Sequence, residues 1–283
     1  MIRIERILTG IDLGPDTEMV LAYAFFFGKL FNASIDLLYV IDYLTTPPSY
    51  MIPYIEEERL SALKSMEKWQ GQLGDRGIKT RSEVIVGRLY ESFDFSLKNR
   101  KVDLLVLGFR SHPLRRSSSE KLVKGLSILM LVVRGEKSKG MRIGDVRIRN
   151  IICPVDFSEH SKKALTIASN LSSLLQERLD ILHVLPVHLL KGKDDKKMKA
   201  IVEMKEEAEK RLKDLTEGLN IPSGKVHILT GEPYGEIISY SKENDADLII
   251  MGARGLGLIR GMILGSVTDA VVRSSPCPVM IIH

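Results

Sequence analysis

The sequence predicts an α/β protein made of two tandem doubly wound domains, each a five-stranded parallel sheet in the order 3-2-1-4-5 with helices on both faces. Two observations lead to this fold class. Short apolar runs alternate with amphipathic stretches along the chain, and four segments recur at one constant spacing. Alternating strands and helices are typical of parallel sheets, whose crossover connections are right-handed.

The repeat is carried by four pairs of segments. I-L-T-G-I-D-L at 7–13 matches I-I-C-P-V-D-F at 151–157, which places Asp12 against Asp156 at an offset of 156 − 12 = 144. The same offset relates 35–40 to 179–184, 84–90 to 228–234, and 102–110 to 246–254. One constant shift over this length predicts two copies of a domain, at 1–135 and 147–283, joined by a polar, glycine-bearing linker at about 134–145.

Each copy alternates strands with helices. In the first copy we expect strands near 5–11, 35–41, 82–87, 103–108 and 128–133, and helices at 15–31, 54–73, 90–99 and near Glu120. In the second copy we expect strands near 149–155, 179–185, 225–230, 247–251 and 278–282, and helices at 158–175, 194–217, 234–243 and 266–274. The first and fourth strands of each copy flank the point where the strand order reverses, and ligands of such folds bind there.

Composition narrows the class of protein. The chain is 44% hydrophobic and 27% charged, and no apolar run approaches the ~20 residues of a membrane span. The N-terminus lacks the apolar core of a signal peptide, so we expect a cytoplasmic protein with no membrane partner. A net charge of +5 without a nucleic-acid-reading motif predicts no nucleic-acid partner. Cys153 and Cys277 have no metal or redox spacing, so we expect buried thiols, and the histidines give no metal site.

A glycine-rich junction follows the fourth strand of the second copy. Glycines recur at 252, 255, 257, 261 and 265, and Ser266 and Thr268 open the next helical stretch. The first N–H groups of a helix have no intrahelical partner and the helix dipole is positive there, so this junction favours a phosphate. Glycine lets the backbone approach phosphate oxygens closely. Ser266 and Thr268 are either hydroxyl donors to that phosphate or helix caps.

The spacing G-x-x-G-x9-G-S formed by Gly252, Gly255, Gly265 and Ser266 resembles the signature of ATP-binding universal stress proteins. The V-D-F-S-E, L-H-V and S-V-T-D segments resemble the same family, and the tandem arrangement resembles its two-domain members. The resemblance implies an adenine-nucleotide-binding stress-response or regulatory module. Its ligand would be ATP, ADP or AMP, with or without Mg²⁺. The two domains would pair as an intramolecular pseudo-dimer, and a further homodimer stays open.

The resemblance also implies, position by position, which residues of the second domain form the site. The adenosine end would be lined by Pro154, Val155, Asp156, Val184, Met251 and Gly252, with adenine against the backbone of Val184. The phosphates would be surrounded by Gly255, Gly265, Ser266, Val267 and Thr268, and Arg254 is placed to neutralise their charge. We expect no catalytic residue, because no carboxylate, histidine or lysine stands beside the glycine loop as an evident water activator.

The two copies differ at this loop. Ser111 stands where the second copy has Gly255. Aligning backwards from the last strand gives an offset of 282 − 133 = 149, so the first loop is 149 − 144 = 5 residues shorter and Arg116 takes the place of Gly265. Such a loop cannot cradle phosphate through glycine N–H groups, although its arginines leave a side-chain anion site as an alternative. We therefore expect the nucleotide in the second domain.

Two other functions stay open at this stage. One is a slow ATPase or a nucleotide-dependent enzyme of a related adenine-binding fold, although the S-G-G-x-D-S and H-I-G-H motifs of such transferases do not occur. The other is a scaffold that has lost nucleotide binding.

Overall fold

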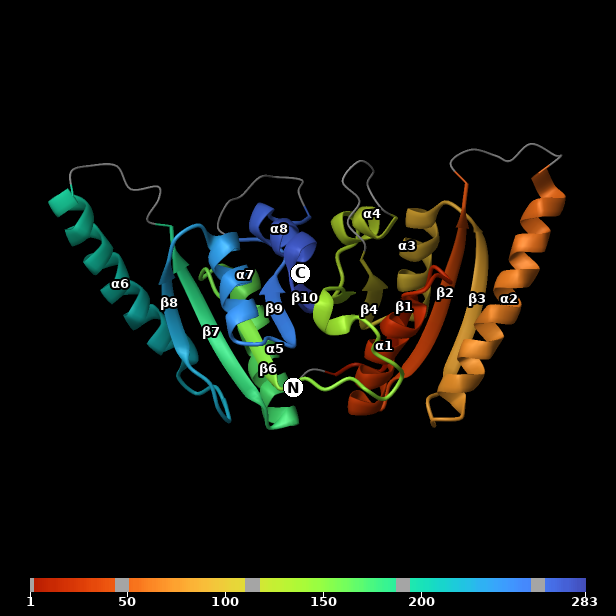
Figure 1. Ribbon diagram of the computed structural model, residues 1–283, viewed down its shortest axis with the longest axis horizontal. Coiled ribbons are helices and arrows are strands. Elements are labelled where there is room, and N and C mark those ends of the chain that lie inside the picture. The colour runs from red at the N-terminus through yellow and green to blue at the C-terminus, as the bar shows by residue number, and fades with distance from the viewer. Residues whose placement is uncertain (1–2, 44–50, 110–117, 187–193, 256–262) are drawn as a thin grey trace. The chain divides into compact units, whose positions relative to one another are not determined.

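The computed structural model describes residues 3–43, 51–109, 118–186, 194–255 and 263–283 of the chain (Figure 1). Contacts within the chain divide these residues into two compact units. The N-terminal unit contains residues 3–134 and 138–146, and the C-terminal unit contains residues 135–137 and 147–283. Each unit is a parallel sheet with helices on both faces.

The N-terminal unit follows the predicted alternation closely. Its elements are β1 (Arg6–Gly10), α1 (Thr17–Phe31), β2 (Ser34–Asp42), α2 (Ile52–Gly74), β3 (Thr80–Gly87), α3 (Leu89–Arg100), β4 (Leu104–Gly108), α4 (Ser118–Gly125) and β5 (Met130–Val133). The strand pairs are all parallel and give the order β3-β2-β1-β4-β5.

The C-terminal unit repeats this arrangement. Its elements are β6 (Asn150–Pro154), α5 (Glu159–Leu175), β7 (Arg178–Leu185), α6 (Asp194–Thr216), β8 (Val226–Thr230), α7 (Pro233–Glu243), β9 (Leu248–Gly252), α8 (Ser266–Ser274) and β10 (Val279–Ile282). Parallel pairing gives the order β8-β7-β6-β9-β10, which is again 3-2-1-4-5 within the unit. The predicted α/β class is confirmed, and the predicted elements agree with the structure apart from small differences at their ends.

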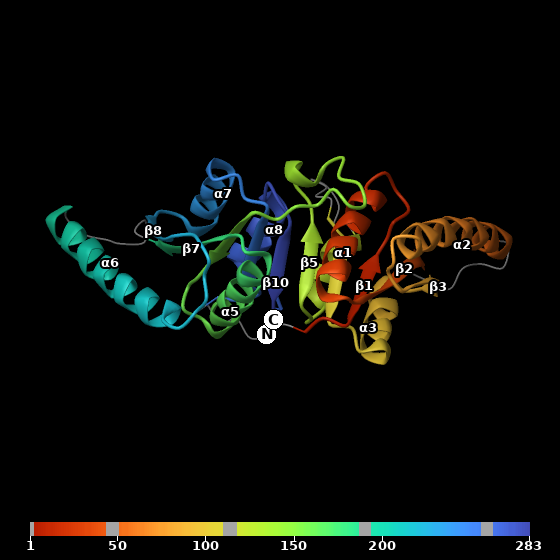
Figure 2. The ribbon, with the colours of Figure 1, turned by 90° about the horizontal axis from the view of Figure 1, so that it is seen from below.

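The two faces of each sheet are covered by different helices. Figure 2 shows α1 and α3 on opposite sides of the first sheet, and α5 and α7 on opposite sides of the second. Strands enclosed in this way are apolar on both faces, as the fully buried run of β9 illustrates. Cys153 and Cys277 lie in this core, as predicted, and burial raises the pKa of the Cys277 thiol to about 12.

Each sheet also buries one carboxylate, at equivalent positions of its second strand. Asp36 is paired with Arg100, whose Nη1 lies 3.2 Å from Asp36 Oδ2. Asp180 is paired with Arg178, 2.6 Å from Nη2 to Oδ2, and it accepts a hydrogen bond of 2.9 Å from the hydroxyl of Tyr240. A buried charge without such partners would be strongly destabilising. Both copies of the domain therefore have this buried carboxylate, but the groups that pair with it differ between the copies.

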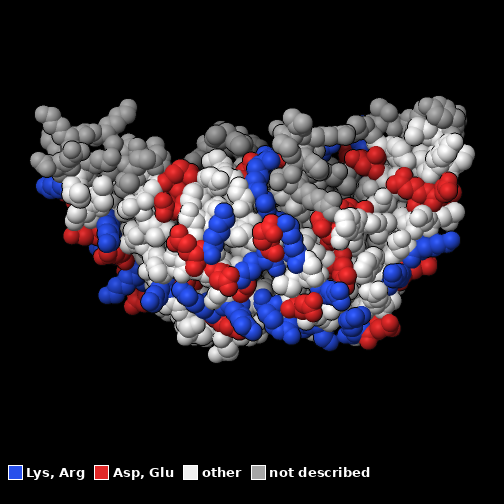
Figure 3. All heavy atoms as spheres, viewed as in Figure 1, with Lys and Arg blue, Asp and Glu red and all other residues white. Residues whose placement is uncertain are grey.

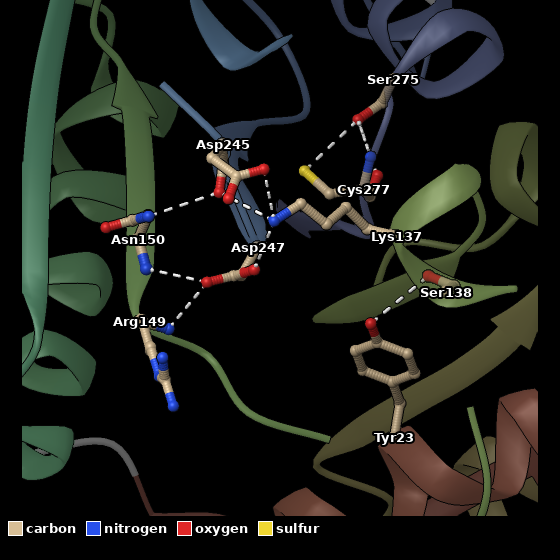
Figure 4. Close-up of polar contacts among 9 residues, drawn as sticks. All are labelled: Tyr23, Lys137, Ser138, Arg149, Asn150, Asp245, Asp247, Ser275 and Cys277. Carbon is tan, nitrogen blue, oxygen red and sulfur yellow. Dashed lines mark hydrogen bonds and ion pairs between the residues drawn. The ribbon is translucent and has the colours of Figure 1, made fainter. Parts of the chain in front are cut away.

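The segment after β5 packs with the C-terminal unit before the chain returns to the N-terminal one. Gly135 has φ of +89°, and an added Cβ would collide with the backbone of Pro276. Lys137 Nζ lies 2.7 Å from Asp245 Oδ1 and 3.2 Å from Asp247 Oδ1 (Figure 4). The other carboxylate oxygen of Asp247 accepts from the backbone N–H groups of Arg149 and Asn150, so this cluster fixes the start of β6.

The placement of charged side chains and the hydropathy of the helices agree with the mixed charge and moderate hydrophobic content of the sequence. On the face drawn in Figure 3, basic and acidic side chains are interspersed, so the net charge is not gathered there into one patch. Among the helices that the structure describes, none is both long enough and apolar enough to cross a membrane.

One titratable side chain is buried where the last strand ends. The Nε2 atom of His283 is buried, and no residue in the described part of the chain offers it a hydrogen bond. Burial, together with the positive charges of His160 and Arg254, lowers the pKa of His283 from its ordinary value of 6.5 to about 4. The folded protein therefore keeps this imidazole neutral in mildly acidic solution.

This shift predicts an acid-dependent loss of stability. Between about pH 6.5 and about pH 4 the unfolded chain protonates His283 and the folded protein does not, so the free energy of unfolding falls as the pH falls through this window. We expect His283→Gln to reduce that fall by about 1–3 kcal/mol. Urea unfolding of both proteins at about pH 7.5 and about pH 4.5 measures it. An equal fall in both would show that His283 is protonated in the folded state.

Candidate functional site

The hydrogen-bonded ladder between the central strands of the C-terminal unit stops before the strands end. β6 and β9 are paired at Ile151 with Leu248 and at Ile152 with Ile249, and the ladder stops there. Pro154 ends β6 and has no N–H to donate to a neighbouring strand, which accounts for a ladder that is not resumed. This gap in the ladder falls at the carboxyl ends of the two strands that flank the reversal of strand order, where ligands of such folds bind.

The predicted adenosine-end residues come together around this gap. Pro154 and Val155 are buried at the end of β6, and Met251 and Gly252 are buried at the end of β9. The Val155 N–H donates to the Leu182 carbonyl at 2.7 Å, which carries the chain on beside β7 after β6 has ended.

Two further members of this set are less enclosed. Val184, near the end of β7, is half-buried and stands opposite Leu229 of β8. Asp156 is also half-buried and directly follows Val155. Both lie at the same carboxyl edge of the sheet as the four buried residues, as the sequence predicted for the wall of a ligand site.

Asp156 is held in a tight turn. Its Oδ1 accepts hydrogen bonds from the backbone N–H of Ser158 at 3.0 Å and from the Ser158 hydroxyl at 2.6 Å. Ser158 is also the N-cap of α5, because its Oγ accepts from the Ser161 N–H at 3.2 Å. The carboxylate is therefore fixed in direction, with Oδ2 turned toward the glycine loop, where a Cβ on Gly255 would strike it.

The glycines of the loop serve close approach and not left-handed backbone. Gly252, Gly255 and Gly265 are absent from the residues with positive φ. A Cβ on Gly252 would lie 2.8 Å from the backbone of His160 and Ser161, so glycine lets the start of α5 touch the end of β9. Gly257 and Gly261 lie outside the described residues. The close approach that Gly252 and Gly255 permit is therefore to α5 and to the Asp156 carboxylate, whereas the approach to phosphate oxygens stays a prediction.

The phosphate-end residues meet at the start of α8. Gly265 is its N-cap, without a side-chain cap, and its own N–H donates to the Ala253 carbonyl at 2.7 Å. A Cβ on Gly265 would lie 3.5 Å from Ala253 O and 3.7 Å from Gly255 N, so a longer side chain here would lie over the Gly255 N–H. Ser266 is exposed and, with Val267, supplies N–H groups of the first helical turn, which have no intrahelical partners.

Two predicted side chains have structural partners instead. The Thr268 hydroxyl is buried and donates to the Gly252 carbonyl at 2.8 Å, which ties α8 to the end of β9. Arg254 Nε donates to the Ile263 carbonyl at 3.3 Å and so closes the loop on itself. Neither Ser266 nor Thr268 caps the helix, so the capping interpretation fails for both. Of the two hydroxyls, only that of Ser266 is exposed at this turn.

The ladder at the corresponding place in the N-terminal unit is not interrupted. β1 and β4 stay paired as far as Gly10 and Leu107, at the end of β1, and Gly10 occupies the position of Pro154. A Cβ on Gly10 would lie 2.5 Å from the Leu107 side chain and 2.8 Å from the Phe93 ring, so these side chains pack closely on this strand end. The predicted loop differences at Arg110, Ser111, Arg115 and Arg116 lie outside the described residues.

Sequence reasoning missed three residues next to the site. Phe157, His183 and Arg211 stack on one another beside Asp156. In the sequence, His183 aligns with Tyr39, which indicates packing, and Arg211 ends a lysine-rich run of mixed charge at 191–211 that is typical of an exposed helix face. A cation on one helix and a ring on a distant loop have no sequence spacing that would reveal their contact.

Comparison with known proteins adds the family. A profile of the universal stress protein family matches residues 3–134 and again residues 147–283. A universal stress protein of Thermus aquaticus is 30% identical over 138 residues, which cover 48% of this chain and 98% of that protein. Universal stress protein MJ0577 of Methanocaldococcus jannaschii is 28% identical over 155 residues, covering 48% and 96%.

A solved structure extends the likeness to both units. The crystal structure of a universal stress protein from Archaeoglobus fulgidus is similar over 98% of each chain, with a TM-score of 0.69 and 24% identity, which supports the fold. The repeated sheet, the repeated match to the family profile and this coverage agree. The chain therefore belongs to the universal stress protein family and is a tandem member with two copies of its domain.

Proposed function

We propose that this protein is an adenine-nucleotide-binding module of stress response or regulation, and that the nucleotide binds in the C-terminal unit. The observation that carries the proposal is the uncapped start of α8, which is tied to the end of β9 by Thr268 and lies at the edge where the β6–β9 ladder stops. Apolar strand ends and a helix N-terminus held together in this way suit a ligand with a flat, mostly apolar ring at one end and phosphates at the other.

The proposed orientation follows from the chemistry of the two ends. The Ser266 and Val267 N–H groups and the exposed Ser266 hydroxyl would hold phosphate oxygens, with Arg254 adding positive charge nearby. The nucleoside would lie against Pro154, Val155 and Met251, with adenine at the Val184 backbone. The fixed Asp156 carboxylate would accept from ribose hydroxyls. Thr268 would act by holding α8 against Gly252, and Mg²⁺ is not needed by any of these contacts.

Binding is proposed for one unit only. In the N-terminal unit the β1–β4 ladder has no gap, and the Phe93 and Leu107 side chains pack closely on Gly10 at the end of β1. The proposed binding stoichiometry is therefore one nucleotide per chain.

The first prediction concerns affinity. Gly255→Ala should displace the Asp156 carboxylate, and Gly265→Arg should cover the loop amides with the residue that the first copy carries there. Each should weaken ATP binding by about tenfold or more, since one lost charged contact contributes about 1.5–3 kcal/mol. Isothermal titration of nucleotide-free protein measures both affinity and stoichiometry.

Gly71→Ala is the matched control for these variants. Gly71 lies inside α2, and a Cβ there would meet nothing within 4 Å, so ATP binding should not change. Two ATP per chain, or full affinity in Gly265→Arg, would contradict the proposed site. Absence of binding by the unaltered protein to any adenine nucleotide would favour a scaffold.

The second prediction separates binding from turnover. Because the Asp156 carboxylate is committed to the Ser158 turn, we expect no sustained hydrolysis of radiolabelled ATP above that of Gly265→Arg. Repeated turnovers that disappear in this variant would instead establish an ATPase.

A further inference from the structure

A cluster of three side chains, here called the stack, lies beside Asp156. The guanidinium carbon of Arg211, from α6, stands 4.0 Å from the centroid of the Phe157 ring. The imidazole of His183, from β7, packs on the Phe157 ring. The centroids of the two rings are 4.6 Å apart and their planes are inclined by 46°. Phe157 is only 8% exposed, although it belongs to a connecting turn. A cation at this distance from a ring face is attracted by the ring quadrupole.

The backbone of Phe157 is in a conformation that needs support. Its φ is +66°, in the left-handed region that bulky residues disfavour. This conformation turns the chain back so that the Asp156 carboxylate meets the Ser158 N–H. Outlying backbone of this kind persists where the surroundings hold it, and the Arg211 and His183 side chains are among the groups packed on this residue.

The stack also fixes the second segment that frames the gap. His183 Nδ1 lies 2.7 Å from the Val155 carbonyl oxygen, and because a carbonyl only accepts, Nδ1 carries the proton. Burial is the main cause that lowers the pKa of His183, so the ring is neutral at pH 7. His183 directly precedes Val184. One stack therefore holds Val155 and Asp156 on one side of the adenosine end and Val184 on the other.

The N-terminal unit repeats the turn without the stack. Leu13 has φ of +54° at the position of Phe157, and Asp12 Oδ1 accepts from the Gly14 N–H at 2.9 Å. The position of His183 is taken by Tyr39, whose hydroxyl donates to Glu58 at 3.1 Å. A leucine has no ring to attract a cation. Within this chain the stack therefore accompanies the interrupted ladder and is missing where the ladder is continuous.

We propose that Arg211 is a positioning residue for the nucleoside: through Phe157 and His183 it holds the adenosine end of the site in its binding geometry and couples helix α6 to nucleotide affinity. This inference rests on the proposed function and deepens it. The contacts that define the stack join Arg211, Phe157 and His183 to one another and to the Val155 carbonyl, all at the adenosine end. Its loss should therefore weaken recognition of the nucleoside and leave recognition of phosphate unchanged.

Four variants of the full chain test the proposal. Arg211→Gln removes the cation with little change of shape, and Arg211→Lys keeps a cation that packs less well on a ring. Phe157→Leu introduces the residue of the first copy. Lys210→Gln, at an exposed position of the same helix, is the matched control for loss of one positive charge. Titration of each with ATP, adenosine and inorganic tripolyphosphate gives the dissociation constants, and circular dichroism checks folding.

We expect ATP and adenosine to bind about tenfold more weakly to Arg211→Gln and Phe157→Leu, with intermediate values for Arg211→Lys. Tripolyphosphate should bind all variants as it binds the unaltered protein, and Lys210→Gln should not differ from it. Unchanged ATP and adenosine affinities in folded Arg211→Gln would overturn the inference while leaving the proposed function standing. A parallel loss for all three ligands would overturn it too, in favour of a general structural role. If the unaltered protein binds no adenine nucleotide, the proposed function and the inference fail together.

Discussion

The carboxyl edge of the C-terminal sheet depends on a hydrogen bond that Pro154 cannot make. A parallel ladder continues as long as each strand offers alternating N–H and C=O groups, and proline supplies no N–H. In the N-terminal unit Gly10 stands at the same position and the ladder runs on to Leu107. In the C-terminal unit pairing ends two residues before β6 does, at Ile152. The unpaired strand ends beside which the proposed function places its ligand follow from this one residue.

Three close contacts hold the elements around these strand ends in place. Close contact of β9 with α5 requires Gly252, and close contact of the loop with the Asp156 carboxylate requires Gly255. The Thr268 hydroxyl then ties the start of α8 to the end of β9. The wall is preorganised by short side chains and backbone contacts, which lose little conformational freedom when a ligand binds. Such preorganisation suits the binding of a ligand at the proposed site.

Much of the fold was predictable, because the repeat at one offset and the alternation of strands with helices fix the order of elements. The edge at which Asp156, Gly252 and Ser266 gather followed from the same pattern, since parallel strands end at one side of a sheet. The contacts of individual side chains were harder to predict from the sequence. The motif predicts that Thr268 is a phosphate ligand. In the structure its hydroxyl donates to the Gly252 carbonyl, a contact that depends on how α8 packs on β9 and has no signal in the sequence. The contact of Arg211 with Phe157 joins residues over fifty positions apart through packing alone.

The short passage of chain from Gly135 to Lys137 bears on how the protein can be divided. These residues belong to the C-terminal unit by their contacts, although the repeat itself resumes only at residue 147. A C-terminal fragment starting at Arg147 would lose the ammonium group that Lys137 places between Asp245 and Asp247, leaving two neighbouring carboxylates to repel each other at the base of β6 and β9. The halves of this molecule are thus interleaved along the chain, and a cut that respects the sequence repeat would not respect the fold.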